Sequence, residues 1–139
     1  PIEVVNSFVA IANRGTLYRP MILKEVLDNN GQVIEEKEVE VLNHDFVKKE
    51  NLEIVREGMR LAVTEGSATT LNSLPVAVAA KTGTAQIPKA GYYHNWVTVF
   101  APYEDPEIVL TIMIEEVEGV RAAALPVAKE ILEWYFENR

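Results

Sequence analysis

The chain has 139 residues, the size of a single folded domain, and 48% of them are hydrophobic, which is enough to form a core. Its formal net charge is −8 and its basic residues are scattered, so it lacks the basic patch of a nucleic-acid-binding protein. It has no cysteine, which excludes disulfides, zinc–thiolate sites and cysteine nucleophiles. We expect no nucleic-acid partner, no metal and no cofactor.

The first predicted element is a helix that begins at Pro1, a residue suited to the first helical turn. Four apolar residues follow at helical spacing: Ile2, Val5, Val9 and Ala12. The sequence Asn-Arg-Gly at 13–15 predicts the end of this helix. Because the sequence opens on Pro1 without an initiator methionine, we expect it to be part of a longer protein, truncated on its N-terminal side.

A small β-ribbon is predicted next. Residues 16–20 form a connector, in which Pro20 bars an immediate second helix. Residues 21–27 and 33–41 then flank Asp-Asn-Asn-Gly at 28–31, whose Asn-Gly pair is a strong hairpin signal. Because charged residues alternate along these segments, we expect one exposed two-stranded ribbon.

A second helix is predicted over residues 49–63, with Gly66 as its stop and a short helical turn over 66–71. Its expected apolar face consists of Leu52, Val55, Met59 and Ala62. Its expected polar face consists of Glu53, Arg56, Glu57 and Arg60.

Three strands and a helix complete the predicted chain. The strands are expected at 76–80, leading into Lys81, at 95–101 and at 107–116, joined by short loops. The last strand is nearly continuously apolar, which predicts burial on both faces. The final helix is expected over 122–138. Its predicted apolar stripe is Val127, Ile131, Leu132 and Tyr135.

This order of elements predicts an α+β fold, with a three-stranded antiparallel meander covered by helices and a small β-ribbon beside it. No linker, internal repeat or low-complexity segment divides the chain. Residues 1–139 are therefore expected to form one unit.

The segment Lys81-Thr82-Gly83-Thr84 carries the strongest chemical signal. On a regular strand, Lys81 and Gly83 point to one face and the two threonines to the other. Glycine allows a ligand or another backbone to approach closely, and an unpaired Thr84 N–H at a sheet edge would donate to a developing oxyanion. The segment therefore suits an oxyanion or a carboxylate.

The longer string Lys-Thr-Gly-Thr-Ala-Gln at 81–86 resembles the third motif of the penicillin-binding proteins, and its full length is typical of class B, the monofunctional transpeptidases. Within that class, the resemblance is to the elongation-type penicillin-binding protein 2 group. Further segments resemble the same family in the family's order: residues 10–20, 57–63 with 66–68, 95–102 and 122–127.

The resemblance implies part of a penicillin-binding protein and serine β-lactamase-like fold that cross-links peptidoglycan. A serine would attack the D-Ala-D-Ala end of a stem peptide, and β-lactams would acylate the same serine. Lys81 would be the cation that supports proton transfer and binds near the substrate carboxylate, and the Thr82 and Thr84 hydroxyls would hold that carboxylate. Gly83 would keep the strand open to substrate, and the Thr84 N–H would be an oxyanion-hole donor.

The family's two upstream motifs, Ser-x-x-Lys and Ser-x-Asn, are missing from the chain. Its three serines, Ser7, Ser67 and Ser73, fit neither pattern. Because nucleophile activation needs a base within hydrogen-bond reach, we expect the chain to contain no nucleophile and to be inactive alone. Two alternatives stay open: a D,D-carboxypeptidase or β-lactamase relative, and a non-catalytic binding or sensor module.

The resemblance also implies partners and a location. The intact protein would bind stem peptides and β-lactams at the outer face of the cytoplasmic membrane, through an anchor absent from this chain. The longest apolar run falls well short of the roughly 20 residues of a spanning helix. Strand 107–116 would lose its neighbour in the truncated sheet, which predicts self-association through that edge or cover by the last helix.

Several side chains near the predicted strands have an open role. Tyr92, Tyr93 and Trp96 suit either an acceptor-side groove or packing, and His94 suits either the cleft or a hairpin. Three acidic residues close together, Glu115, Glu116 and Glu118, are interpreted as a solvated strand end.

Overall fold

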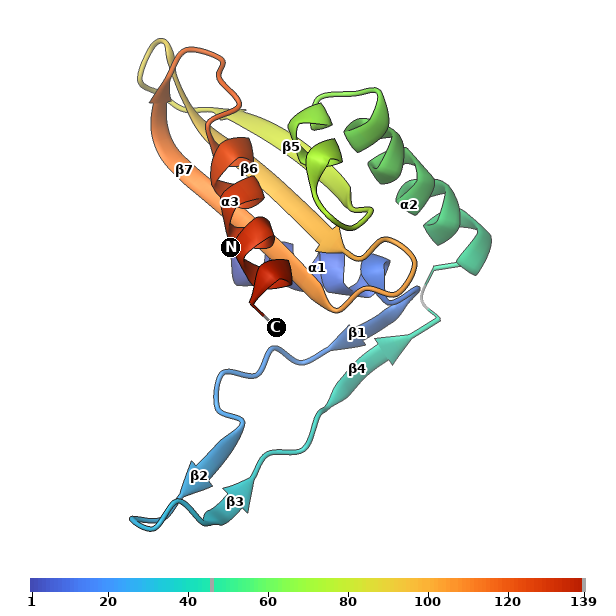
Figure 1. Cartoon of the computed structure of the whole chain (residues 1–139), viewed down its shortest axis with the longest axis vertical. Coiled ribbons are helices and arrows are strands. Elements are labelled where there is room, and N and C mark those ends of the chain that lie inside the picture. The colour runs from blue at the N-terminus through green and yellow to red at the C-terminus, as the bar shows by residue number, and fades with distance from the viewer. Residues whose placement is uncertain (46, 139) are drawn as a thin grey trace.

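The computed structural model describes residues 1–45 and 47–138. Its centre is a three-stranded antiparallel sheet of β5 (Ala79–Gln86), β6 (Tyr92–Ala101) and β7 (Ile108–Glu118), in the order β5-β6-β7. Figure 1 shows this sheet in the upper part of the molecule. The predicted α+β class and antiparallel meander are confirmed.

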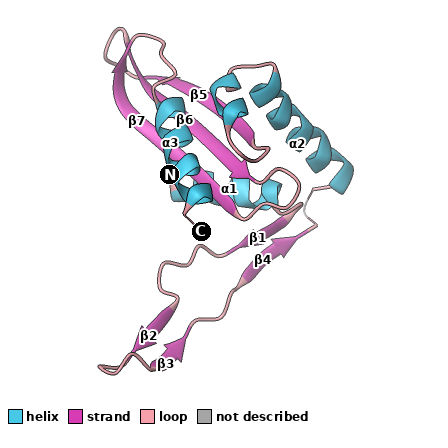
Figure 2. Ribbon diagram, viewed as in Figure 1, coloured by secondary structure: helices cyan, strands magenta, loops and turns pink. Residues whose placement is uncertain are grey.

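Helices cover both faces of the sheet (Figure 2). Helix α1 (Ile2–Ala12) lies on one face, and α3 (Ala124–Glu137) lies on the other. Helix α2 (Lys49–Thr64) packs beside β5 and is followed by the short 3-10 helix η1 (Thr69–Ser73). None of the described helices is long and apolar enough to span a lipid bilayer.

The core has two parts because residues on a strand alternate between the faces of the sheet. The larger part lies on the α3 face. It includes Val78, Ala80, Val97, Val99, Leu71, Leu125, Ala128 and Leu132. The smaller part lies on the α1 face and consists of Ala12, Met59, Ala79 and Phe100. Helix α2 contributes to both parts, through Val63 and Met59, and so fixes the start of β5.

The predicted ribbon is longer and more divided than expected. It contains two antiparallel pairs, β1 (Thr16–Tyr18) with β4 (Val41–His44) and β2 (Glu25–Leu27) with β3 (Val33–Glu36). The expected connector at 16–20 thus includes a strand, because Arg19 N–H donates to the Glu40 carbonyl and continues the pairing. We call residues 16–44 the arm; it projects away from the sheet (Figure 1).

The two turn signals of the N-terminal half are confirmed. Gly31 has a φ of +80° and its N–H donates to the Asp28 carbonyl at 3.0 Å, which closes the hairpin at the tip of the arm. Gly15 has a φ of +119° and ends α1. Both conformations favour glycine, since a Cβ is strained at positive φ.

The prediction for Arg56 is wrong. This residue was expected on the polar face of α2 but is only 1% exposed, whereas Val55, expected on the apolar face, is 45% exposed. The Arg56 guanidinium donates to the carbonyls of Ala12 and Tyr103. A buried charge is tolerated when it is hydrogen-bonded in this way.

Two burial patterns also differ from the prediction. On α3, Leu132 is buried as expected, but Val127 and Ile131 are each 40% exposed because Leu125 and Ala128 face the sheet instead. Strand β7 is half-buried rather than buried on both faces. Among the described residues, β7 pairs with β6 alone and is an edge of the sheet.

Candidate functional site

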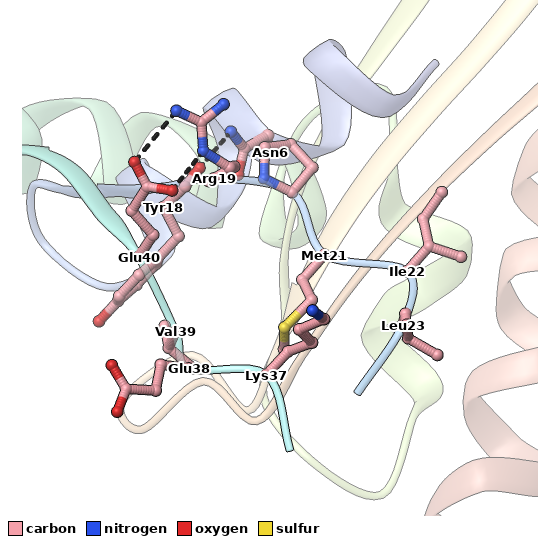
Figure 3. A pocket seen from close by; sticks show the side chains of 11 residues that line it. Asn6, Tyr18, Arg19, Met21, Ile22, Leu23, Lys37, Glu38, Val39 and Glu40 are labelled. Atoms are coloured by element: carbon pink, nitrogen blue, oxygen red, sulfur yellow. Dashed lines mark hydrogen bonds and ion pairs between the residues drawn. The ribbon is translucent and has the colours of Figure 1, made fainter. Parts of the chain in front are cut away.

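One cavity lies in the arm, away from the Lys-Thr-Gly strand. It measures about 590 Å³ and lies between the segment 18–23 and the facing segment 37–40, with Asn6 of α1 also in its lining (Figure 3). Two of the charged groups in its lining pair with each other, since Arg19 donates to Glu40 at 3.0 Å. This hydrogen bond raises the pKa of Arg19 and lowers the pKa of Glu40. The lining of this cavity includes no residue of the Lys-Thr-Gly strand.

The segment Lys81-Thr82-Gly83-Thr84 lies in the middle of β5, not at the end of a strand as predicted. Its register with β6 is regular, and Lys81, Gly83 and Thr84 pair with Thr98, Trp96 and Asn95. The expected alternation therefore holds: Lys81 and Gly83 face α1, and the two threonines face the α3 side. Among the described residues, β5 pairs with β6 alone and is the other edge of the sheet.

Lys81 lies in a small pocket on the α1 face of β5. The pocket measures about 190 Å³, and its lining includes Phe8, Gly83 and Trp96. The ammonium of Lys81 donates to the Thr82 carbonyl at 2.7 Å, so its side chain turns back along the strand toward the open edge.

The two threonines line a different pocket, of about 240 Å³. The Thr82 hydroxyl lies 2.7 Å from the Ser67 hydroxyl, a distance at which one donates to the other. Asn95, on β6, is buried to 4% exposure, and its Oδ1 accepts from the N–H of Ala124 at the start of α3. Arg121 lines the same pocket from the loop before α3.

The backbone conformation does not require glycine at position 83, because the φ of Gly83 lies outside the positive region. A Cβ built at this position would lie 3.4 Å from the Trp96 Cβ, at the limit of an ordinary contact. Glycine here keeps the strand surface low beside Trp96, which suits the approach of a ligand.

The residues left open by the sequence lie around the hairpin between β5 and β6. His94 Nδ1 accepts from the Glu116 N–H at 3.3 Å, so His94 bridges β6 to an irregular part of β7. Lys89 lies 3.8 Å above the Tyr92 ring and 2.9 Å from Glu116, and its hydrogen bond lowers the pKa of Glu116. Trp96 lines the Lys81 pocket, and Tyr93 pairs with Val117.

The interpretation of the acidic residues near the end of β7 agrees with their exposure. Glu115, Glu116 and Glu118 are all exposed. Within residues 1–45 and 47–138, no group of three or more histidine and acidic side chains is arranged to hold a metal ion.

Three residues of the threonine pocket were missed by sequence reasoning: Ser67, Asn95 and Arg121. They come from three separate segments of the chain, and only the fold brings them to β5. Ser67 and Asn95 lie in segments that resemble the family, but no local pattern marks either as part of a site.

Comparison with known proteins agrees with this geometry. Residues 1–135 match the family model described as the penicillin-binding protein transpeptidase domain. Penicillin-binding protein 2A of Bacillus subtilis is 31% identical over 99% of the chain, and the peptidoglycan D,D-transpeptidase MrdA of Haemophilus influenzae is 27% identical over 100% of it. The chain spans 22% and 24% of the lengths of these two relatives.

Solved structures show the same fold. The D,D-transpeptidase domain of a peptidoglycan glycosyltransferase from Eggerthella lenta is 31% identical, with a TM-score of 0.78 over 96% of this chain and 32% of its own. The imipenem acyl-enzyme complex of penicillin-binding protein A from M. tuberculosis is 24% identical, with a TM-score of 0.84 over 98% of this chain and 30% of its own. Since the family model spans residues 1–135, the chain belongs to the penicillin-binding protein transpeptidase domain family and covers part of that domain.

Proposed function

We propose that the intact protein is a serine-type D,D-transpeptidase that cross-links peptidoglycan stem peptides and binds β-lactams, and that this chain supplies one wall of its active site. The observation that carries the proposal is the placement of Lys81-Thr82-Gly83-Thr84 on the open edge of the sheet, within a chain of this family. We also propose that residues 1–139 form one unit of a larger domain.

In the proposed reaction, a serine outside this chain attacks the carbonyl carbon of the penultimate D-Ala. An ester forms, the peptide bond breaks, and the terminal D-Ala leaves with a proton on its nitrogen. The amine of a neighbouring stem peptide then attacks the ester and releases the serine. Lys81 supports proton transfer in these steps, and the Thr82 and Thr84 hydroxyls hold the substrate carboxylate.

The edge of β5 suits substrate binding as an added strand, a mode in which backbone hydrogen bonds give affinity. The carbonyls of Val78 and Thr82 accept hydrogen bonds from the side chains of Arg60 and Lys81. This supports the view that the backbone groups of residues 78, 80, 82 and 84 point away from β6, toward the free edge of β5. The N–H and C=O of alternate residues point the same way on a strand. Thr84 N–H is then the outward donor that stabilises the oxyanion, and Gly83 leaves room beside it.

Two other functions use the same strand. A D,D-carboxypeptidase or β-lactamase would pass the acyl group to water, and a sensor module would bind a ligand without a nucleophile. The relative named as a peptidoglycan D,D-transpeptidase, matched over 100% of this chain, favours transfer to an amine. We place the intact protein at the outer face of the cytoplasmic membrane, where the stem peptides are.

Labelling by a fluorescent penicillin tests the proposal. The intact protein is expected to form a covalent adduct that survives denaturing electrophoresis and is blocked by excess unlabelled penicillin. The purified 139-residue chain is expected to form none, because none of Ser7, Ser67 and Ser73 has a lysine three residues on. An intact protein that stays unlabelled would contradict the enzymatic proposal, and a labelled 139-residue chain would contradict the missing nucleophile.

We further propose that the 139-residue chain self-associates through the edge of β7. An exposed apolar strand edge is a template for pairing with another chain. Because each copy carries a charge of −8, association is expected to increase with ionic strength. Analytical ultracentrifugation over a salt series measures it. A monomer at all salt and protein concentrations, with rapid amide exchange in β7, would speak against the pairing.

A further inference from the structure

The Lys-Thr-Gly strand presents its cation and its hydroxyls on opposite sides. Thr82 and Thr84 line the pocket of about 240 Å³, whereas Lys81 does not line it and turns back onto the Thr82 carbonyl. A carboxylate held by the two hydroxyls therefore needs a cation from elsewhere, since hydrogen bonds in which one partner is charged are the strong ones.

Arg121 is the cation in that pocket. It lies on the loop between β7 and α3 and lines the pocket together with both threonines. Its guanidinium makes no hydrogen bond or ion pair with any other described residue. In a chain with 21 acidic and 13 basic residues, a free guanidinium beside two hydroxyls is a marked local excess of positive charge.

The floor and wall of the pocket add further donors. Asn95 is 4% exposed and its Oδ1 is occupied by the Ala124 N–H, so its Nδ2 group, which has no partner among the described residues, remains as the donor for the pocket. The Ser67 hydroxyl fixes the Thr82 hydroxyl at 2.7 Å. The pocket also borders the start of α3, where the helix dipole favours a negative charge.

Ser67 is held firmly in this position. A Cβ on Gly66 would lie 2.9 Å from the Ala62 backbone, so the loop is packed directly on the end of α2. On the other side, Ala68 is fully buried and its N–H donates to the Ala62 carbonyl at 2.8 Å. The Ser67 side of the pocket is therefore formed before any ligand binds.

We propose that Arg121 is the residue that recognises the carboxylate of the substrate and of β-lactams, with Asn95 and Ser67 completing the pocket, and that Lys81 acts in proton transfer instead. This inference rests on the proposed transpeptidase function. It separates carboxylate binding from proton transfer, two roles that the resemblance assigns together to Lys81. Arg121 acts on binding of the ligand, and Lys81 acts on the chemical step.

Acylation kinetics of the intact protein with a fluorescent penicillin test this division. Arg121→Gln is expected to raise the apparent Kd about ten-fold or more, since a hydrogen bond to a charged group is lost, and to leave the acylation rate constant within about two-fold. Arg121→Lys should recover part of the affinity, because it keeps the charge but loses the planar fork. Lys24→Gln, the same loss of charge on the exposed arm, is the matched control and should change neither constant.

The methyl ester of the same penicillin separates carboxylate recognition from a structural effect. With the ester, wild type and Arg121→Gln should acylate with equal efficiency. An unchanged Kd in Arg121→Gln, or an equal loss with acid and ester, would overturn the inference while leaving the proposed function in place. A wild-type protein that is not acylated at all would overturn both.

Discussion

Replacing Lys81 by methionine is expected to lower the rate constant for acylation of the intact protein by a β-lactam by about 10²–10⁴-fold, the range for loss of a positioned proton-transfer group. The apparent Kd should change little, because Lys81 does not line the threonine pocket. Methionine keeps an unbranched apolar stem of similar length and removes the ammonium, which donates to the Thr82 carbonyl. Rapid-mixing measurements over a range of β-lactam concentrations give the two constants separately.

Lys129→Met is the matched control for this substitution. Lys129 lies on α3 and pairs with Glu133 at 3.3 Å, away from β5, so its loss should leave both constants unchanged. A Lys81→Met protein that acylates at the wild-type rate would exclude Lys81 from proton transfer. A variant with a normal rate constant and a raised Kd would show that Lys81 binds the substrate carboxylate instead.

Local sequence predicted the elements whose causes are local. The Asn30-Gly31 pair formed the hairpin at the tip of the arm, and Gly15 ended α1, because each glycine adopts a positive φ that other residues rarely adopt. The alternation along 81–84 predicted which side chains share a face, since that follows from strand geometry alone.

Burial was predicted less well because it depends on what packs against each element. Arg56 looks polar on a helical wheel, yet the carbonyls at the end of α1 and in the turn after β6 need its donors. Strand β7 looks like a central strand, yet among the described residues it has a neighbour on one side alone. Neither fact can be derived from the segment itself.

The same reason limits how much of the site was predicted. The residue types of the Lys-Thr-Gly strand, including the hydroxyls of Thr82 and Thr84, were enough to predict it as part of a site. Ser67, Asn95 and Arg121 are ordinary residues in their own segments. They become part of a site only because the loop after α2, strand β6 and the loop before α3 meet beside β5.

Arg56 is expected to be the side chain whose loss destabilises the fold most among the charged residues described. Its guanidinium lies over the rings of Phe100 and Tyr103, at 4.8 Å and 5.3 Å from their centroids. Burial, with a smaller effect from Arg14, lowers the pKa of Arg56. Its Nε lacks a hydrogen-bond partner, since the Glu53 carboxylate at 3.4 Å is an ion-pair contact without hydrogen-bond geometry.

Arg56→Met should therefore lower the free energy of unfolding by about 3 kcal/mol, because the carbonyls of Ala12 and Tyr103 lose their donors and each such group costs about 1–3 kcal/mol. The melting temperature, Tm, should fall accordingly. Thermal unfolding of the intact protein, followed by near-UV circular dichroism, measures the change. Arg56→Lys should be intermediate, since a single ammonium cannot replace the fork.

Arg14→Met provides the comparison that distinguishes a buried cation from an exposed one. Arg14 pairs with Glu53 at 2.7 Å, but both side chains are more than 40% exposed, so the pair is worth about 0–1 kcal/mol. If Arg56→Met were no more destabilising than Arg14→Met, then the contacts of Arg56 with α1 and with the turn after β6 would contribute little. The junction of α1, α2 and the sheet would in that case be held by Met59, Phe100 and their apolar neighbours alone.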